Sequence, residues 1–411
     1  MTENPFKGAV IFSSRSDVLS VIRTEAKQRG IDPIMTPEGA EHAVEDLVRH
    51  PRALLILDWQ VGVAKAMQIL DAVRSPIRAE IRPIFLFSAE EVPHLEGVCI
   101  EYGVLSMHMG EFTRNTIKEK LEEMSKAEPY DDEIVDGLIV VTESRKRDDW
   151  QAAGALLEEL SAKHPQVTRL KTDLAENYFH LEEYDKAKEA LLPLCQLENP
   201  DPRALNLLGR VQMVHGDFSE ASVTLQKAKV INPFNIERLV ALGDAYLNID
   251  MVDRAEINFR KAVEHGCKDD AAIGGLGKSL LMGNKIDEGL VFMKQLSGNR
   301  EMASVFNTAA VLSMRSGRYV DGMKLYHVAL KTIKGEDQVL SKIAFNMGIG
   351  FHRNSSNDKA ALCFAVAVAL YDGHKKAKQN LDSLVKLGAK APSLSDNRED
   401  WLKTLDEIDI A

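Results

Sequence analysis

Cysteine is scarce in this sequence, and the few cysteines that occur are widely spaced. The 411 residues include four, separated by 72 to 96 positions: Cys99, Cys195, Cys267 and Cys363. Zinc ligands usually come in pairs a few residues apart, and small disulfide-stabilised domains carry many cysteines, so this spacing favours neither. We expect four reduced thiols and no metal centre.

The sequence also lacks a basic block and a long apolar run. Lysine and arginine number 51 against 62 aspartates and glutamates, which gives a formal charge of −11. Nucleic-acid binding needs clustered Lys and Arg that neutralise phosphates, so we expect no nucleic-acid partner. No apolar run approaches the ~20 residues that span a bilayer, and the first residues include a glutamate where a secretory signal is basic. We therefore expect a cytoplasmic protein that does not insert into a membrane.

The first 125 residues alternate short apolar runs with amphipathic stretches. The apolar runs are Ala9–Phe12, Ile31–Met35, Ala53–Leu57, Ile84–Phe87 and Val104–His108. The helical patterns between them are Asp17–Arg29, Glu38–Arg49, Ala64–Val73, Glu91–Tyr102 and Thr113–Met124. Strands that are apolar on both faces and separated by helices indicate a parallel sheet covered on both sides. The sequence predicts a doubly wound, five-stranded α/β domain of the flavodoxin-like type over 1–125.

After a polar linker, 126–133, the pattern becomes helical throughout and repeats every 34 residues. Leu208-Gly209, Phe218, Ala221 and Leu225 recur 34 positions later as Leu242-Gly243, Val252, Ala255 and Phe259. The small residues in these columns allow two helices to approach closely, and the large ones fill the gap to the next pair. These columns resemble the tetratricopeptide repeat. The resemblance implies an all-α solenoid over 134–388, with about seven copies and a capping helix at Lys375–Leu387, and then a tail over 389–411 that can form a last helix.

The N-terminal pattern resembles the receiver domain of bacterial response regulators. The resemblance implies an acidic pair that holds magnesium, an aspartate that accepts phosphate, and a hydroxyl and a lysine that bind the phosphoryl oxygens. Asp58 matches the phosphoacceptor and Ser88 the hydroxyl, but Ser13 and Ser14 stand at the acidic pair. The family's lysine is missing from the stretch 107–112, Met-His-Met-Gly-Glu-Phe. Because hydroxyls cannot replace two carboxylates as magnesium ligands, we interpret the domain as a degenerate receiver.

Arg15 follows directly after the missing acidic pair. Its guanidinium is able to pair with Asp58 and take the place of both lost cations, which would hold the domain in one conformation. The alternative is an exposed Arg15 and a solvated Asp58. No other pattern in the sequence places a nucleophile beside a base, so we expect no enzyme and no cofactor.

The resemblance to tetratricopeptide repeats implies that the first helices of successive pairs line a concave groove. Arginine and asparagine there suit carboxylates and extended backbones, while Met and Phe suit apolar anchors. The residues expected to face this partner-binding groove are Arg203, Asn206, Arg210, Met213, Asp244, Lys278, Asn307 and Phe345. The alternative for each of them is an ordinary solvated position on a helix.

These features together predict a non-enzymatic adaptor or scaffold in bacterial signalling, which binds proteins or peptides through the groove and the receiver-like surface. Two alternatives stay open. In one, Asp58 is phosphorylated and the repeats are the output of a working response regulator in a two-component system. In the other, the chain is a structural assembly factor that forms a homodimer through its receiver-like domain. The sequence also leaves open whether the tail from Pro392 blocks the groove.

Overall fold

The computed structural model describes residues 6–50, 52–75, 82–126, 131–267, 269–390 and 392–410. The chain divides into two compact units, Met1–Leu239 (unit 1) and Val240–Ala411 (unit 2), and each is described by itself. Unit 1 contains all five described strands and the first helical pairs. Unit 2 contains helices only, within its described residues.

Five parallel strands form one sheet in the order β2-β1-β3-β4-β5. They are β1 (Ala9–Phe12), β2 (Ile34–Met35), β3 (Leu54–Asp58), β4 (Ile84–Ser88) and β5 (Ser106–Met109). β1, β3 and β4 are buried along their whole length, because runs that are apolar on both sides need cover on both faces. The five-stranded parallel sheet predicted from the sequence is confirmed. The edge strand β2 is shorter than expected, and it pairs with β1 through two residues only.

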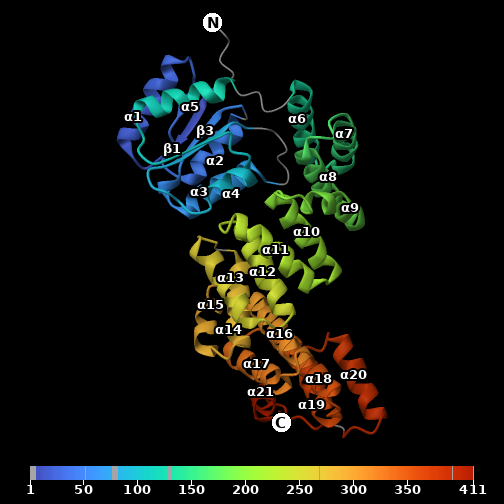
Figure 1. Ribbon diagram of the computed structural model, residues 1–411. Helices are drawn as coiled ribbons and strands as arrows, with labels where there is room; N and C mark the ends of the chain where they lie inside the picture. Colours follow the sequence, from blue (N-terminus) through green and yellow to red (C-terminus); the bar gives the residue numbers. More distant parts are fainter. Residues whose placement is uncertain are drawn as a thin grey trace. The chain divides into compact units, whose positions relative to one another are not determined.

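Helices cover the two faces of this sheet (Figure 1). One core packs α1 (Ser16–Gln28) and α5 (Arg114–Lys126) against side chains such as Ile11, Ile56 and Phe85. The other packs α2 (Ala40–Arg49), α3 (Val63–Val73) and α4 (Leu95–Tyr102) against side chains such as Leu55 and Leu86. A short 3-10 turn, η1 (Trp59–Val61), connects β3 to α3.

The predicted start of the fourth helix, Glu91, is wrong. Helix α4 begins at Leu95, because His94 has a left-handed backbone with φ of 67° and the preceding Pro93 also disfavours a helix interior. The helix ends at Tyr102, and the residue that caps it, Gly103, has a left-handed backbone with φ of 58°. Of the expected linker 126–133, residues 127–130 lie outside the described part of the chain.

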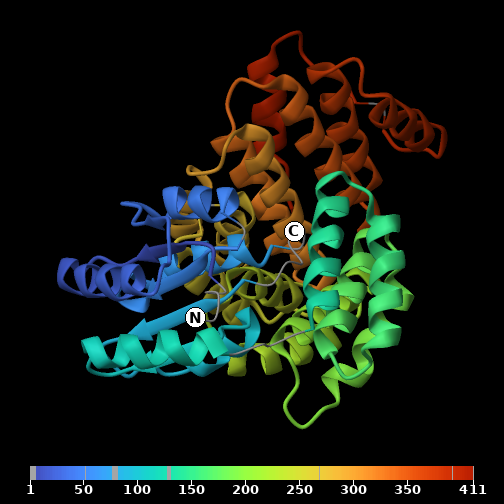
Figure 2. The same cartoon turned by 90° about the horizontal axis from the view of Figure 1, so that it is seen from above.

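Successive helices pack as pairs in the rest of unit 1, and Figure 2 shows the first two pairs side by side. They are α6 (Asp132–Lys146) with α7 (Trp150–Lys163), α8 (Thr168–His180) with α9 (Tyr184–Cys195), and α10 (Pro202–His215) with α11 (Phe218–Ile231). Gly209 permits the close approach of α10 and α11, since a Cβ there would lie 2.5 Å from Cγ of Leu225. The boundary between the units falls inside α12 (Ile236–Asn248).

Unit 2 continues the same pairing. Gly243 in α12 faces Phe259 in α13 (Val252–Glu264), and a Cβ at Gly243 would lie 2.5 Å from the ring. The next pairs are α14 (Asp270–Met282) with α15 (Ile286–Met293), α16 (Asn299–Arg315) with α17 (Tyr319–Thr332), and α18 (Asp337–Arg353) with α19 (Asn357–Leu370). Helix α20 (Lys375–Lys386) then packs on α19.

The tail forms one more helix, α21 (Arg398–Glu407), which packs on α17 and α19. Leu405 is completely buried there, and ion pairs join Lys331 to Asp406 (3.0 Å) and Lys359 to Asp409 (3.3 Å). Both supporting helices are the second members of their pairs. The first residue of the tail helix, Arg398, in addition pairs with Asp337 at the start of the first helix α18 (2.6 Å). Among the helices described, none has the length and apolar character needed to cross a membrane.

Candidate functional site

Asp58 lies at the carboxyl end of β3, beside the end of β1, and its side chain is completely buried. Ser13 Oγ donates to Asp58 Oδ2 at 2.6 Å, and Arg15 Nε donates to the same oxygen at 3.1 Å. The other oxygen, Oδ1, accepts from the backbone N–H of Gln60 at 3.0 Å and so caps η1. Both carboxylate oxygens thus have donors from the chain itself. The structure brings together Ser13, Arg15 and Asp58 among the residues singled out in the sequence.

Ser14 and Ser88 take different places around this carboxylate. Ser14 is exposed, and it is not among the partners of Asp58. Ser88 ends β4 in a buried position, where its Oγ accepts the backbone N–H of Glu90 at 3.3 Å. A serine here is therefore occupied with shaping the loop after β4.

Stacked aromatic rings lie beside Arg15 in the surroundings of Asp58, which we call the Asp58 pocket. The guanidinium carbon of Arg15 lies 5.7 Å from the centroid of the Phe87 ring, and Phe87 stacks on Phe112 at 4.2 Å. Phe112 belongs to the stretch 107–112, where the resemblance noted in the sequence implies a lysine. Within the residues described, no group of three or more His, Cys, Asp or Glu side chains is arranged to hold a metal ion. The pocket therefore offers one carboxylate, one hydroxyl and one fixed cation.

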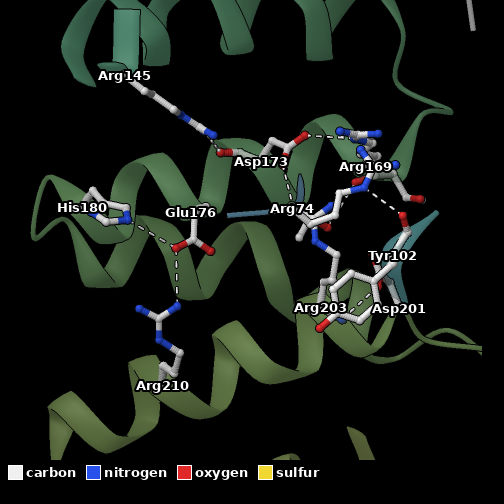
Figure 3. Close-up of polar contacts among 12 residues, drawn as sticks. Arg74, Tyr102, Arg145, Arg169, Asp173, Glu176, His180, Asp201, Arg203 and Arg210 are labelled. Carbon is white, nitrogen blue, oxygen red and sulfur yellow. Dashed lines mark hydrogen bonds and ion pairs between the residues drawn. The ribbon is translucent and has the colours of Figure 1, made fainter. Parts of the chain in front are cut away.

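A second polar cluster, here called the Asp173 network, joins the first helices of the pairs in unit 1 (Figure 3). Asp173 accepts from Arg203 at 2.9 Å and from Arg169 at 3.3 Å, and its backbone oxygen accepts from Arg145 at 2.7 Å. Burial alone would raise the pKa of the Asp173 carboxyl, but the charges of Arg203, Arg169 and Arg145 outweigh it and hold that pKa below its usual value. Asp173 is therefore ionised and shared among these arginines.

The Asp173 network continues to Glu176 and Arg210. Arg210 lies 3.4 Å from Glu176 and 3.2 Å from Glu237, and its guanidinium stands 4.4 Å from the centroid of Phe179. Two expected groove residues, Arg203 and Arg210, are thus already paired within the chain. Between them Asn206 is buried and its Oδ1 has no hydrogen bond, while Met213 is half-buried.

Unit 2 contains a hollow of about 220 Å³ that is lined by residues of three first helices, α12, α14 and α16. We call it the α12–α16 groove. Its lining residues are Asp244, Leu247, Asn248, Lys278, Asn307, Thr308, Val311, Leu312 and Arg315. Asp244, Lys278 and Asn307 were expected here from the sequence, and the structure brings all three together. Phe345 does not line the groove. It packs on Phe364 and His374, with ring centroids 5.5 and 4.7 Å apart.

The α12–α16 groove contains several hydrogen-bond donors beside one carboxylate, that of Asp244. Lys278 Nζ lies 3.4 Å from Asp244 Oδ1, and the Tyr326 hydroxyl donates to Asn307 Oδ1 at 2.9 Å, which leaves the Asn307 NH₂ group free to donate into the groove. Arg315 is exposed and makes no ion pair with any described residue. The arrangement suits an extended chain that offers carbonyl oxygens and a carboxylate.

The sequence analysis missed five residues of this groove: Asn248, Thr308, Val311, Leu312 and Arg315. Helix spacing could have indicated two of them. Val311 and Arg315 follow Asn307 at steps of four and so share its helix face. In addition, Glu176 and Arg210 are 34 positions apart, as are Asp244 and Lys278. Opposite charges in one column of consecutive repeats thus mark pairs on neighbouring first helices.

Comparison with known proteins identifies the helical repeats. The family model described as Tetratricopeptide repeat matches residues 145–211. No curated protein matches the sequence.

Several solved structures are similar at low identity. MamA is 17% identical, with 44% of this chain and 97% of that chain covered and a TM-score of 0.35. A tetratricopeptide repeat protein from Parabacteroides merdae is 16% identical, with 62% and 100% covered and a TM-score of 0.41. YrrB, described as a TPR protein with an unusual peptide-binding site, is 15% identical, with 47% and 97% covered and a TM-score of 0.29. These TM-scores are too low to establish a shared overall fold. What the family match does show is that the helical part of this chain contains tetratricopeptide repeats, over residues 145–211.

Proposed function

We propose that the protein is a non-enzymatic adaptor of bacterial signalling, in which a degenerate receiver domain over 1–125 precedes a solenoid of tetratricopeptide repeats over 134–388. The strand order β2-β1-β3-β4-β5 supports a flavodoxin-like, receiver-type domain. The packing of helices α6 to α19 in successive pairs supports a solenoid of about seven repeats. In this proposal the chain acts in the cytoplasm by binding other proteins.

The receiver-like domain works without phosphorylation. The observation that supports this is the ion pair of Arg15 with the completely buried Asp58, together with the hydrogen bond from Ser13. Phosphoryl transfer to an aspartate requires a metal ion that neutralises the incoming phosphate. Arg15 supplies the positive charge directly to the carboxylate instead, and no second carboxylate stands at the end of β1 to hold magnesium.

The partner binds in the α12–α16 groove as an extended segment with an acidic side chain. Leu247, Val311 and Leu312 offer apolar contact area, and the Asn307 NH₂ group can donate to a backbone carbonyl. Arg315 is a cation without an internal partner among the described residues, so it complements a carboxylate.

Site-specific photocrosslinking in the intact protein tests the groove. A photoreactive residue at Thr308 in the groove should crosslink a discrete partner, whereas one at the exposed Val320 on α17 should not. The reversal Arg315→Glu should abolish the Thr308 crosslink. The matched control is Lys324→Glu, since Lys324 is exposed on a second helix. Equal crosslinking from Val320, or a crosslink unaffected by Arg315→Glu, would contradict the groove as the binding site.

A further inference from the structure

Helix α4 of the α/β part carries a buried carboxylate that is bound by the turn between α11 and α12. Glu101 accepts hydrogen bonds from Asn232 Nδ2 (2.9 Å), Asn235 Nδ2 (2.8 Å) and Arg238 Nη2 (2.8 Å). All four residues are buried, and we call them the Glu101 network. One turn earlier, Gly97 lies so close to the carbonyl of Ile231 that a Cβ would collide with it. The α/β part and the repeats of unit 1 are thus joined by a close, buried contact.

The three turn residues of the Glu101 network, Asn232, Asn235 and Arg238, also form hydrogen bonds with backbone groups of the turn itself. Arg238 Nη1 donates to the Asn232 carbonyl at 2.7 Å, and the Asn235 Oδ1 accepts the Arg238 N–H at 2.8 Å. The Asn232 Oδ1 accepts the N–H of Phe234 at 3.0 Å. The conformation of the turn, residues 232–238, is therefore coupled to whether Glu101 is seated in it.

The same turn is contacted by the residue that follows Asp58. The Trp59 ring is buried and meets the ring of Phe234 edge-on, with centroids 5.3 Å apart. Trp59 occupies the first position of η1, and η1 is fixed by the Asp58 cap on the N–H of Gln60. A short chain of contacts thus leads from Arg15 through Asp58 and Trp59 to the turn.

We propose that the Arg15–Asp58 pair sets how tightly the α/β part docks on the turn 232–238, with Trp59 as the connecting side chain. When Arg15 is paired with Asp58, the Asp58 carboxylate keeps the position in which it caps η1, and Trp59 contacts Phe234. Displacing Arg15 from Asp58 loosens η1, withdraws Trp59 and weakens the Glu101 network. The pocket that corresponds to a receiver's phosphorylation site then controls the repeats through a contact of its own. This coupling does not depend on what the α12–α16 groove binds.

Hydrogen exchange of the full chain provides the readout, because two backbone N–H groups report on the turn. The Phe234 and Arg238 N–H groups both donate to side chains of the Glu101 network. In Arg15→Gln and in Asp58→Asn we expect both to exchange about tenfold faster, while the amides of Leu55 and Leu57 in the buried strand β3 keep their protection. The control Arg23→Gln removes an arginine of α1 that donates to Thr36 and is not among the partners of Asp58, so it should change neither.

The role of Trp59 is tested by combining variants. Trp59→Leu should itself accelerate exchange at Phe234 and Arg238, and adding Arg15→Gln should then give no further increase. Glu101→Gln should also accelerate exchange at the Phe234 and Arg238 amides. If it does so while Arg15→Gln leaves their exchange unchanged, docking of the α/β part does not depend on the Arg15–Asp58 pair. Equal effects of Arg15→Gln with and without Trp59 would overturn Trp59 as the connection. Arg15→Gln leaves the hydrogen bonds of Asp58 with Ser13 and Gln60 in place. This variant therefore tests the proposal even if Asp58→Asn unfolds the sheet.

Discussion

Glu101 and Arg238 lie 137 positions apart in the sequence, yet their side chains meet at 2.8 Å and both are buried. The pair is not an isolated contact, because two asparagine amides also donate to Glu101 and the Asn232 carbonyl accepts from Arg238, although Nε of Arg238 has no hydrogen bond. A buried ion pair is strongly affected when one partner is removed, since the other charge then stays buried without a counterion.

Removing one partner of this pair should destabilise the protein. We expect Glu101→Ala to lower the free energy of unfolding of unit 1, measured in urea, by about 3–5 kcal/mol. The exposed pair of Arg49 and Glu45 provides the control, and Glu45→Ala should cost less than about 1 kcal/mol. The account of the interface would fail if the two variants unfolded at the same urea concentration.

Asp71 should make stability depend on pH near neutrality. Burial, reinforced by the charge of Glu101, raises the pKa of Asp71 from 3.8 to about 7, while the hydrogen bond from Tyr102 acts in the opposite direction. Between these two values the folded state holds a proton that the unfolded chain has released. The free energy of unfolding therefore falls as pH rises from about 4 to about 7, by at most about 4 kcal/mol, and the contribution is constant above that range.

The variant Asp71→Asn isolates this effect from other titrating groups. In this variant the free energy of unfolding should no longer lose the contribution of Asp71 as pH rises. The difference in unfolding free energy between wild type and variant should therefore change from pH 4 to 7 and then stay constant. Urea unfolding at a series of pH values measures it. If the unfolding free energies of the two proteins changed equally with pH, the raised pKa of Asp71 would be contradicted.

Close packing at Gly209 should make even one methyl group costly. Because a Cβ at this position would lie 2.5 Å from Leu225, Gly209→Ala forces the helix pair α10–α11 apart, and we expect a loss of about 1–3 kcal/mol in spite of alanine's better helix propensity. The exposed Glu189 on α9 offers a control, and Glu189→Ala should stay within about 0.5 kcal/mol. A stabilised Gly209→Ala protein would contradict the close approach.

Local patterns account for the parts of the fold that the sequence predicted. Strands such as Leu54–Asp58 are recognisable because they are apolar on both faces, and the 34-residue spacing locates helix pairs through small residues such as Gly209 and Gly243. The start of α4 was misplaced because an amphipathic pattern continues across Pro93 and His94, where the backbone leaves the helical region.

Long-range contacts account for what was missed. Nothing in the periodicity marks Glu101 as a partner of Arg238, since the pairing depends on how α4 lies on the repeats. Arg203 and Arg210 were expected to be free for a partner, but acidic residues on the neighbouring first helix neutralise them. Charge columns one repeat apart would have indicated the second of these pairs.

The central claim is that the Asp58 pocket acts without taking up a phosphoryl group, and one mass measurement tests it directly. The full chain is incubated with magnesium and a small acyl-phosphate donor, and its intact mass is recorded beside that of Asp58→Asn. We predict that neither protein gains the mass of a phosphoryl group, because Arg15 and Ser13 already donate hydrogen bonds to the Asp58 carboxylate. A stoichiometric phosphoryl adduct in the wild type that is absent from Asp58→Asn would contradict the account.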